Sequence, residues 1–152
     1  MGPTSELADP RDIVGCRVLP FPRVRVFDAW TDPARLTRWW GPKGFTSTFE
    51  QFDLRPGGVW RFVLYGPNGA SYPNESVFVE IVPPERIVFD HVSKPVFQVT
   101  ATFAEVAGGT ELTFRQRFET PALRDKIATF AVEANEQNLD RLEAELAREA
   151  SA

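Results

Sequence analysis

Three polar side chains interrupt apolar faces of this sequence, and they are the residues best placed to do chemistry. In TELTFRQRF the alternate positions are apolar, but Gln116 takes one of them. In RIVFDHV the same alternation carries His91, the only histidine, toward the interior with Phe89. Asn135 interrupts the apolar stripe of the last helical segment. An unpartnered buried polar group costs about 1–3 kcal/mol, so these side chains must bond one another, water, the backbone or a ligand.

The residue types around these three favour a small-molecule site. A mostly apolar cavity with a few convergent polar groups is the usual form of such a site. We hypothesise that His91, Gln116 and Asn135 line one, while the alternative, that each is simply satisfied within the core, stays open. Inward positions of the neighbouring segments supply the apolar wall: Trp60, Phe62, Phe89, Phe97, Val99, Phe114 and Leu139.

Acid–base catalysis is the second chemistry open to His91. Asp90 adjoins it, but neighbours on a strand point to opposite faces, so Asp90 is poorly placed to orient the ring. The sequence has no second histidine, no cysteine pair, no phosphate-binding glycine loop before a helix and no serine in a nucleophile elbow. We therefore expect no metal and no cofactor, and favour a non-catalytic role over an enzyme based on His91.

Composition narrows the functional classes further. The 152 residues suffice for one domain with a real core, and 43% hydrophobic and 25% charged residues are ordinary globular values. A net charge of −4 without a basic stripe argues against nucleic-acid binding. No apolar run approaches the ~20 residues that span a membrane, and no secretion signal is visible. We expect a cytoplasmic monomer or homodimer in which the lone Cys16 is buried and inert.

The elements that must position these residues begin with a strand and two short helices. DIVGCRVL predicts the strand, and PFPRVRVFDAW predicts a helix with Val24, Phe27 and Trp30 on its apolar face. Asp32, followed by proline, is a good N-cap for the second helix, ARLTRWW.

From Phe45 the hydrophobic period changes to two and predicts an antiparallel meander. Its strands are expected at residues 45–54, 59–65, 75–82, 86–92, 96–106 and 110–118, with a loop at 66–74. A long helix follows from about residue 120 to 147. Its inward stripe is expected to hold Ala128, Val132, Asn135, Leu139, Leu142 and Leu146.

This order, one strand, two helices, six strands and a helix, predicts an α+β fold in which a curved antiparallel sheet wraps around the long C-terminal helix. We expect a single domain over residues 12–148, with a flexible N-terminus at 1–11 and a tail at 149–152. A strongly curved sheet closing around a helix can leave a cavity, where the polar side chains would meet.

The neighbouring indoles of Trp39 and Trp40 pose a packing problem at the end of the second helix. Adjacent helical residues point about 100° apart, so one helix face cannot easily bury both. Either other elements pack against the helix on two sides, or one indole lines a cavity.

Five stretches together resemble a known family: VFDAWTDPARLTRWWGPKGFT, DLRPGGVWRFVLYGPNG, FVEIVPPERIVFDH, FQVTATFAEVAGGTELTFRQRF and NLDRL. They are similar to the single-domain relatives of the C-terminal domain of the heat-shock protein 90 ATPase activator, in the START-like (SRPBCC) superfamily. The resemblance implies the helix-grip fold, with the two short helices across one end. It also implies that Trp39 and Trp40 lie at a cavity's edge, one in the core and one facing the opening.

The resemblance leaves the function open, because the same scaffold hosts lipid carriers, receptors, cyclases and chaperone modulators. We expect a module that binds a small hydrophobic, lipid- or polyketide-like molecule. The alternatives are a cyclase, dehydratase or hydrolase using His91 in the same cavity, and a chaperone-modulating interaction domain. Direct activation of the chaperone ATPase is not expected, since the eukaryotic activators rely on a separate N-terminal domain for which this chain has no room.

Overall fold

The computed structural model describes residues 9–151, so most of the predicted flexible N-terminus lies outside the described residues. The elements follow the predicted order, and the last helix continues past residue 148, the predicted end of the domain. Their bounds are β1 (Asp12–Leu19), α1 (Arg23–Thr31), α2 (Pro33–Trp39), β2 (Thr46–Phe52), β3 (Val59–Tyr65), β4 (Ser71–Val82), β5 (Arg86–His91), β6 (Phe97–Val106), β7 (Gly109–Phe118) and α3 (Pro121–Ser151).

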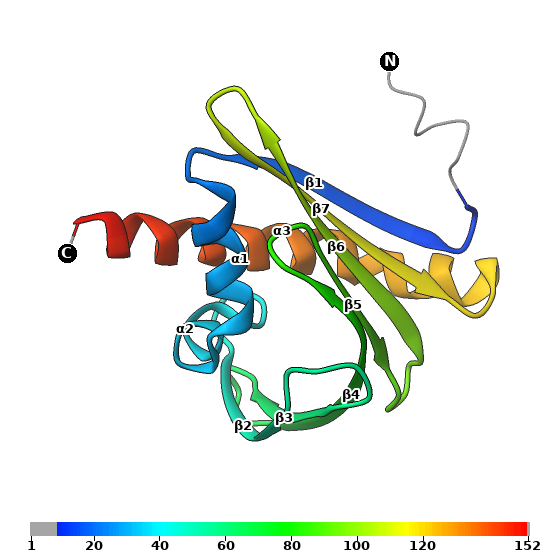
Figure 1. The fold of residues 1–152 in the computed structure, drawn as a ribbon. Coiled ribbons are helices and arrows are strands. Elements are labelled where there is room, and N and C mark those ends of the chain that lie inside the picture. Colours follow the sequence, from blue (N-terminus) through cyan, green and yellow to red (C-terminus); the bar gives the residue numbers. More distant parts are fainter. Residues whose placement is uncertain (1–8, 152) are drawn as a thin grey trace.

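The strands form one curved antiparallel sheet in the order β1-β7-β6-β5-β4-β3-β2, so the first strand lies beside the last (Figure 1). The long helix α3 crosses the sheet, and α1 and α2 lie at one end of it (Figure 1). Helix α3 packs against β1 and β7 and against α1 and α2. The α+β helix-grip architecture predicted from the sequence is confirmed.

Helix α2 is capped as predicted and ends where both of its indoles can be buried. Asp32 accepts a hydrogen bond from the Ala34 amide at 3.0 Å. The helix ends at Trp39, and Trp40 follows in extended backbone (φ −71°, ψ 124°), so the helical spacing no longer separates the two rings. Trp39 is 1% exposed and Trp40 8% exposed. The Trp39 Nε1 donates to the Ala29 carbonyl at 2.9 Å.

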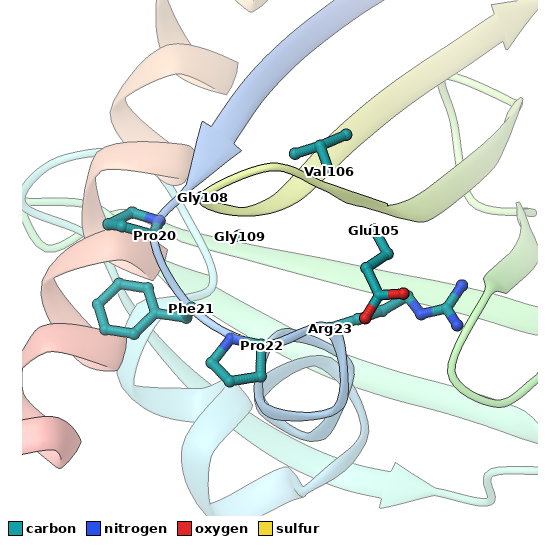
Figure 2. A pocket seen from close by; sticks show the side chains of 8 residues that line it. All are labelled: Pro20, Phe21, Pro22, Arg23, Glu105, Val106, Gly108 and Gly109. Atoms are coloured by element: carbon teal, nitrogen blue, oxygen red, sulfur yellow. The ribbon is translucent and has the colours of Figure 1, made fainter.

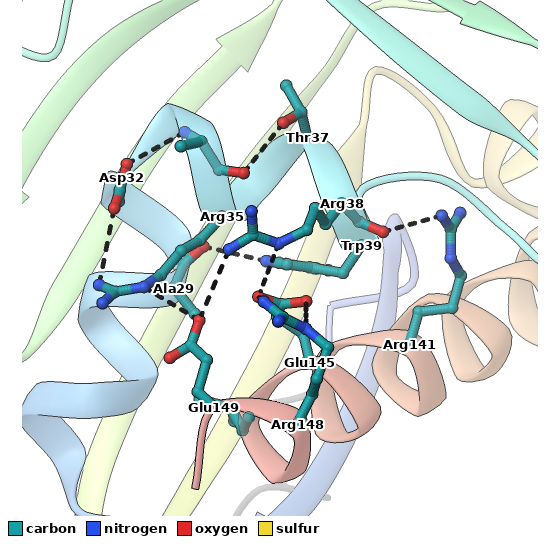
Figure 3. A network of polar contacts seen from close by, with 12 residues as sticks. Ala29, Asp32, Arg35, Thr37, Arg38, Trp39, Arg141, Glu145, Arg148 and Glu149 are labelled. Carbon is teal, nitrogen blue, oxygen red and sulfur yellow. Dashed lines mark hydrogen bonds and ion pairs between the residues drawn. The ribbon is translucent and has the colours of Figure 1, made fainter. Parts of the chain in front are cut away.

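A polar network ties α2 to the C-terminal half of α3 (Figure 3). Glu145 accepts hydrogen bonds from Arg148 Nη2 at 2.8 Å and from Arg38 Nε at 2.9 Å. Burial raises the pKa of the Glu145 carboxyl, but these two arginines outweigh burial and hold the pKa below its usual range. Arg141 donates to the carbonyls of Arg38 and Gly41. The two short helices are therefore fixed against α3.

Two residues predicted to face inward are exposed instead. Val24 is 57% exposed, because α1 turns Val26 toward the core. Val132 is 51% exposed, because the N-terminal half of α3 packs through Ile127 and Ala131, one turn apart. Both helices exist as predicted, but these two inward positions are wrong.

The stretch predicted as a loop, 66–74, contains the start of β4. Pro73 is paired there with Val63 of β3. Strand β5 pairs with β4 only from Ser76 onward, so Pro73 lies at an edge, where a strand tolerates proline. The turn residues that indicated a loop lie partly inside this strand.

Cys16 is exposed, so the prediction of a buried thiol is wrong. Strand β1 turns Ile13 and Leu19 inward, and the pleat then turns Cys16 outward. Its sulfur lies 3.4 Å from Glu111 Oε2 and 3.5 Å from Thr113 Oγ1 of the neighbouring strand.

Candidate functional site

One end of the space between the sheet and the helices is filled by aromatic side chains. Centroid distances of 5.0–6.4 Å separate the Trp40 ring from the rings of Trp60, Trp39, Trp30, Phe62 and Phe89. None of these residues is more than 8% exposed. This closed end is packed core.

The other end of the inner face is less closely covered. Helix α3 lies over β1 and β7, and within residues 9–151 its backbone approaches none of strands β2–β6. Inward-facing side chains at this end are only partly buried: Leu64, Asn74, Phe97 and Asn135. We call the region around these four partly buried side chains the open end.

His91 lies at the open end, inward as predicted and 6% exposed. Its Nδ1 lies 2.8 Å from the Pro95 carbonyl oxygen, and its Nε2 lies 2.7 Å from Asn74 Oδ1 and 3.3 Å from Ser93 Oγ. The ring stacks on Phe97 with centroids 4.5 Å apart. A neutral ring with its hydrogen on Nδ1 donates to the carbonyl and accepts at Nε2, from the Ser93 hydroxyl or from the Asn74 amide once turned.

Stability is expected to fall as the pH drops below about 6.5, through His91. Burial lowers the pKa of His91 below its ordinary value of 6.5, against the hydrogen bonds to Pro95 and Ser93. The unfolded chain then binds more protons than the folded chain between the two pKa values. The contribution of His91 is therefore full above the unfolded pKa, and each pH unit below it removes up to about 1.4 kcal/mol.

Urea unfolding at pH values of about 7.5 and 5.5 measures this effect, since histidine titrates in that range and carboxyls titrate lower. His91→Gln is the control, because the chain has one histidine. An equally steep pH dependence in His91→Gln would contradict the assignment.

The structure brings Gln116 and Asn135 together. Asn135 Nδ2 donates to Gln116 Oε1 at 2.7 Å and so joins α3 to β7. The partners of His91 come instead from β4 and the β5–β6 loop. Phe97 lies between His91 and the Gln116–Asn135 pair. Its ring stacks on His91, and it is paired with Phe118, the next inward residue of β7 after Gln116.

Two inner-face residues of β4, Asn74 and Ser76, escaped the sequence analysis. Asn74 holds the ring of His91, and Ser76 is paired between Trp60 and His91. The Ser76 hydroxyl is buried and, in the described part of the chain, has no hydrogen-bond partner. The alternation of β4 read backward from Phe78 would have placed both residues inward. The turn-forming residues of SYPN indicated a loop at Asn74, whereas Ser76 lies within the predicted strand 75–82 and was overlooked there.

The other predicted site residues are almost fully buried. At most 8% of each is exposed: Trp39, Trp40, Trp60, Phe62, Phe89, Val99, Phe114 and Leu139. Their contact with a ligand stays a prediction.

The model of one protein family, activator of Hsp90 ATPase homolog 1-like protein, matches residues 20–147. The chain belongs to this family. The resemblance based on the five sequence stretches is therefore confirmed. No functionally curated protein matches the chain.

Solved structures share the fold of this member of the Hsp90 ATPase activator homolog family over most of its length. A protein from Rhodobacter sphaeroides is 27% identical, with a TM-score of 0.84 over 93% of this chain and 95% of that one. A protein from Chromobacterium violaceum is 28% identical, with a TM-score of 0.78 over 88% and 95%. A protein from Nitrosomonas europaea is 24% identical, with a TM-score of 0.85 over 93% and 98%.

Three pockets of this family member lie at its surface, and none is an enclosed cavity. One of about 330 Å³ lies between the β1–α1 connection and the β6–β7 turn (Figure 2). A second, of about 310 Å³, lies beside Phe97 and Arg117 at the strand ends. The third, of about 390 Å³, lies between the β5–β6 loop and the start of α3, with Pro95 and Leu123 in its wall. Of the predicted site residues, only Phe97 lines one of them.

Residues 9–151 contain no group of three or more His, Cys, Asp and Glu side chains placed to hold a metal ion. No helix among them is long and apolar enough to cross a membrane.

Proposed function

We propose that this protein binds a small hydrophobic molecule, of the lipid or polyketide type, at the open end and does not transform it. Asn74, His91, Phe97, Gln116 and Asn135 would form the walls of the site. The aromatic rings of the closed end would form its floor.

The partial exposure of the inward-facing Phe97 carries this proposal. Burying an aromatic side chain contributes roughly 1.5–3 kcal/mol, so a sheet normally covers such a ring with the opposing layer. Here the backbone of α3 approaches β1 and β7 and not β6, so Phe97 packs against the core on part of its surface and stays partly exposed on the rest. An apolar molecule in this space would complete the burial of Phe97 and contact the polar side chains around it.

An enzyme using His91 is less well supported. Burial lowers the pKa of His91, which suits a general base near neutral pH. However, both ring nitrogens face oxygen atoms of the chain itself, at 2.8 Å from Pro95 and 2.7 Å from Asn74. A substrate would have to displace one of these partners before the ring could take its proton. A chaperone partner and a cytoplasmic location stay predictions.

Binding of the apolar fluorescent dye N-phenyl-1-naphthylamine tests the proposal. We expect saturable binding by the wild-type chain and about tenfold weaker binding by Phe97→Ala, because the ring contact is lost. Val92→Ala is the control: Val92 is 42% exposed and lines the pocket beside Phe97 from the outer side. Absence of dye binding, or equal weakening by Val92→Ala, would contradict binding at the inner face.

A further inference from the structure

The hydrogen bonds of the Gln116–Asn135 pair are only half satisfied. Asn135 Nδ2 donates to Gln116 Oε1 at 2.7 Å. Within residues 9–151 neither side chain makes another hydrogen bond, so Gln116 Nε2 and Asn135 Oδ1 have no partner. Gln116 is 8% exposed as a residue, but neither of these two atoms is among the fully buried unpartnered ones, so water reaches them until a ligand takes its place.

The pair lies at the boundary between the strands that α3 covers, β1 and β7, and the strands that it leaves uncovered. Gln116 is paired with Ile13 of β1 on one side and with Val99 of β6 on the other. Asn135 comes from α3 and is partly exposed. Phe97 precedes Val99 on the same face of β6 and is itself partly exposed. A molecule that covers Phe97 would therefore adjoin the two amides.

The unpaired groups are one donor and one acceptor whichever way the amides are turned. In the orientation described, they are the NH₂ of Gln116 and the carbonyl of Asn135. With both amides turned, Gln116 would donate to Asn135, and the Gln116 carbonyl and the Asn135 NH₂ would be left. The pair therefore offers a donor beside an acceptor in either case.

We propose that the molecule bound at the open end carries a hydroxyl group, which accepts from one amide of this pair and donates to the other. A hydroxyl satisfies both groups at once. A carboxylate only accepts, so it would face an unpaired carbonyl, and a pure hydrocarbon would leave both groups unpaired. This inference rests on the proposed function and narrows the ligand to hydrophobic alcohols and phenols.

Displacement of N-phenyl-1-naphthylamine by 2-naphthol, 2-naphthoate and naphthalene tests this inference. For the wild-type chain we expect 2-naphthol to bind about tenfold more tightly than naphthalene and more tightly than 2-naphthoate. Gln116→Leu and Asn135→Leu should each remove that advantage while naphthalene binding is kept. Gln51→Leu removes an exposed amide of β2, the opposite edge strand, and should change none of the affinities.

The order of affinities for 2-naphthol, 2-naphthoate and naphthalene is measured on the wild-type chain. It therefore tests the hydroxyl inference even where a leucine variant fails to fold. Equal displacement by 2-naphthol and naphthalene, or preference for 2-naphthoate, would overturn the hydroxyl inference and leave the proposed function standing. Absence of binding by the dye and by all three compounds would overturn both.

Discussion

Trp40→Ala is expected to lower the free energy of unfolding by about 3–5 kcal/mol. The Trp40 ring is 8% exposed and contacts rings from α1, α2, β3 and β5. Because these neighbours are held by different elements, they cannot all move into the space that the indole leaves. Equilibrium unfolding in urea measures the loss directly.

Phe130→Ala is the matched control for this truncation. Phe130 is also a large aromatic side chain, but it lies on α3 and is 64% exposed. Its replacement should change the free energy of unfolding by no more than about 0.5 kcal/mol. Similar losses in the two variants would show that the closed end is not packed core.

Gly58→Ala should cost about 3 kcal/mol or more. The Gly58 amide donates to the Arg55 carbonyl at 2.8 Å, and the Gly58 carbonyl accepts from the Phe78 amide at 2.9 Å. A Cβ at position 58 would overlap the carbonyl oxygen of Asp53. All of these are main-chain atoms, so no side-chain rotation relieves the overlap, and the turn between β2 and β3 must deform.

Gly57→Ala separates this overlap from the cost of an unusual backbone angle. Gly57 has φ +83°, which an alanine adopts poorly, but a Cβ there would meet nothing within 4 Å. We expect a loss of about 1–2 kcal/mol for Gly57→Ala. Denaturant unfolding of both variants compares the two effects. If Gly57→Ala were as damaging as Gly58→Ala, the close approach to Asp53 would not control this turn.

The inner face of the later strands was predictable from the sequence. Leu112, Phe114 and Phe118 are apolar and alternate, so the pleat places Gln116 on their face without further information. The same argument placed His91 inward, and both residues are buried as expected.

The faces of the helices were less predictable. The apolar residues of α3 are spread over more than one face of the helix, so the sequence does not define its buried face. Packing against the sheet buries Ile127 and Ala131 and leaves Val132 exposed. In α1 the core likewise takes Val26 in place of Val24.

The partners within the candidate site could not be derived from residue types. His91 is held by the Pro95 carbonyl, a backbone group that every residue carries, and by Asn74, which lies in a stretch with loop-forming residues. A phenylalanine-rich composition fits a filled core and an open pocket equally well. The structure packs most of the rings at the closed end and leaves Phe97 partly exposed at the open end.

An NMR titration with N-phenyl-1-naphthylamine, observing side-chain amide and histidine ring signals, tests binding at the open end most directly. Binding at the open end should shift the signals of Asn74, Asn135 and His91 and leave that of Gln98 unchanged, because Gln98 lies on the outer face and is bonded to Asp90. Shifts of Gln98 without those of the inner residues would place the molecule on the outer surface. That result, or an unchanged spectrum, would contradict binding at the open end.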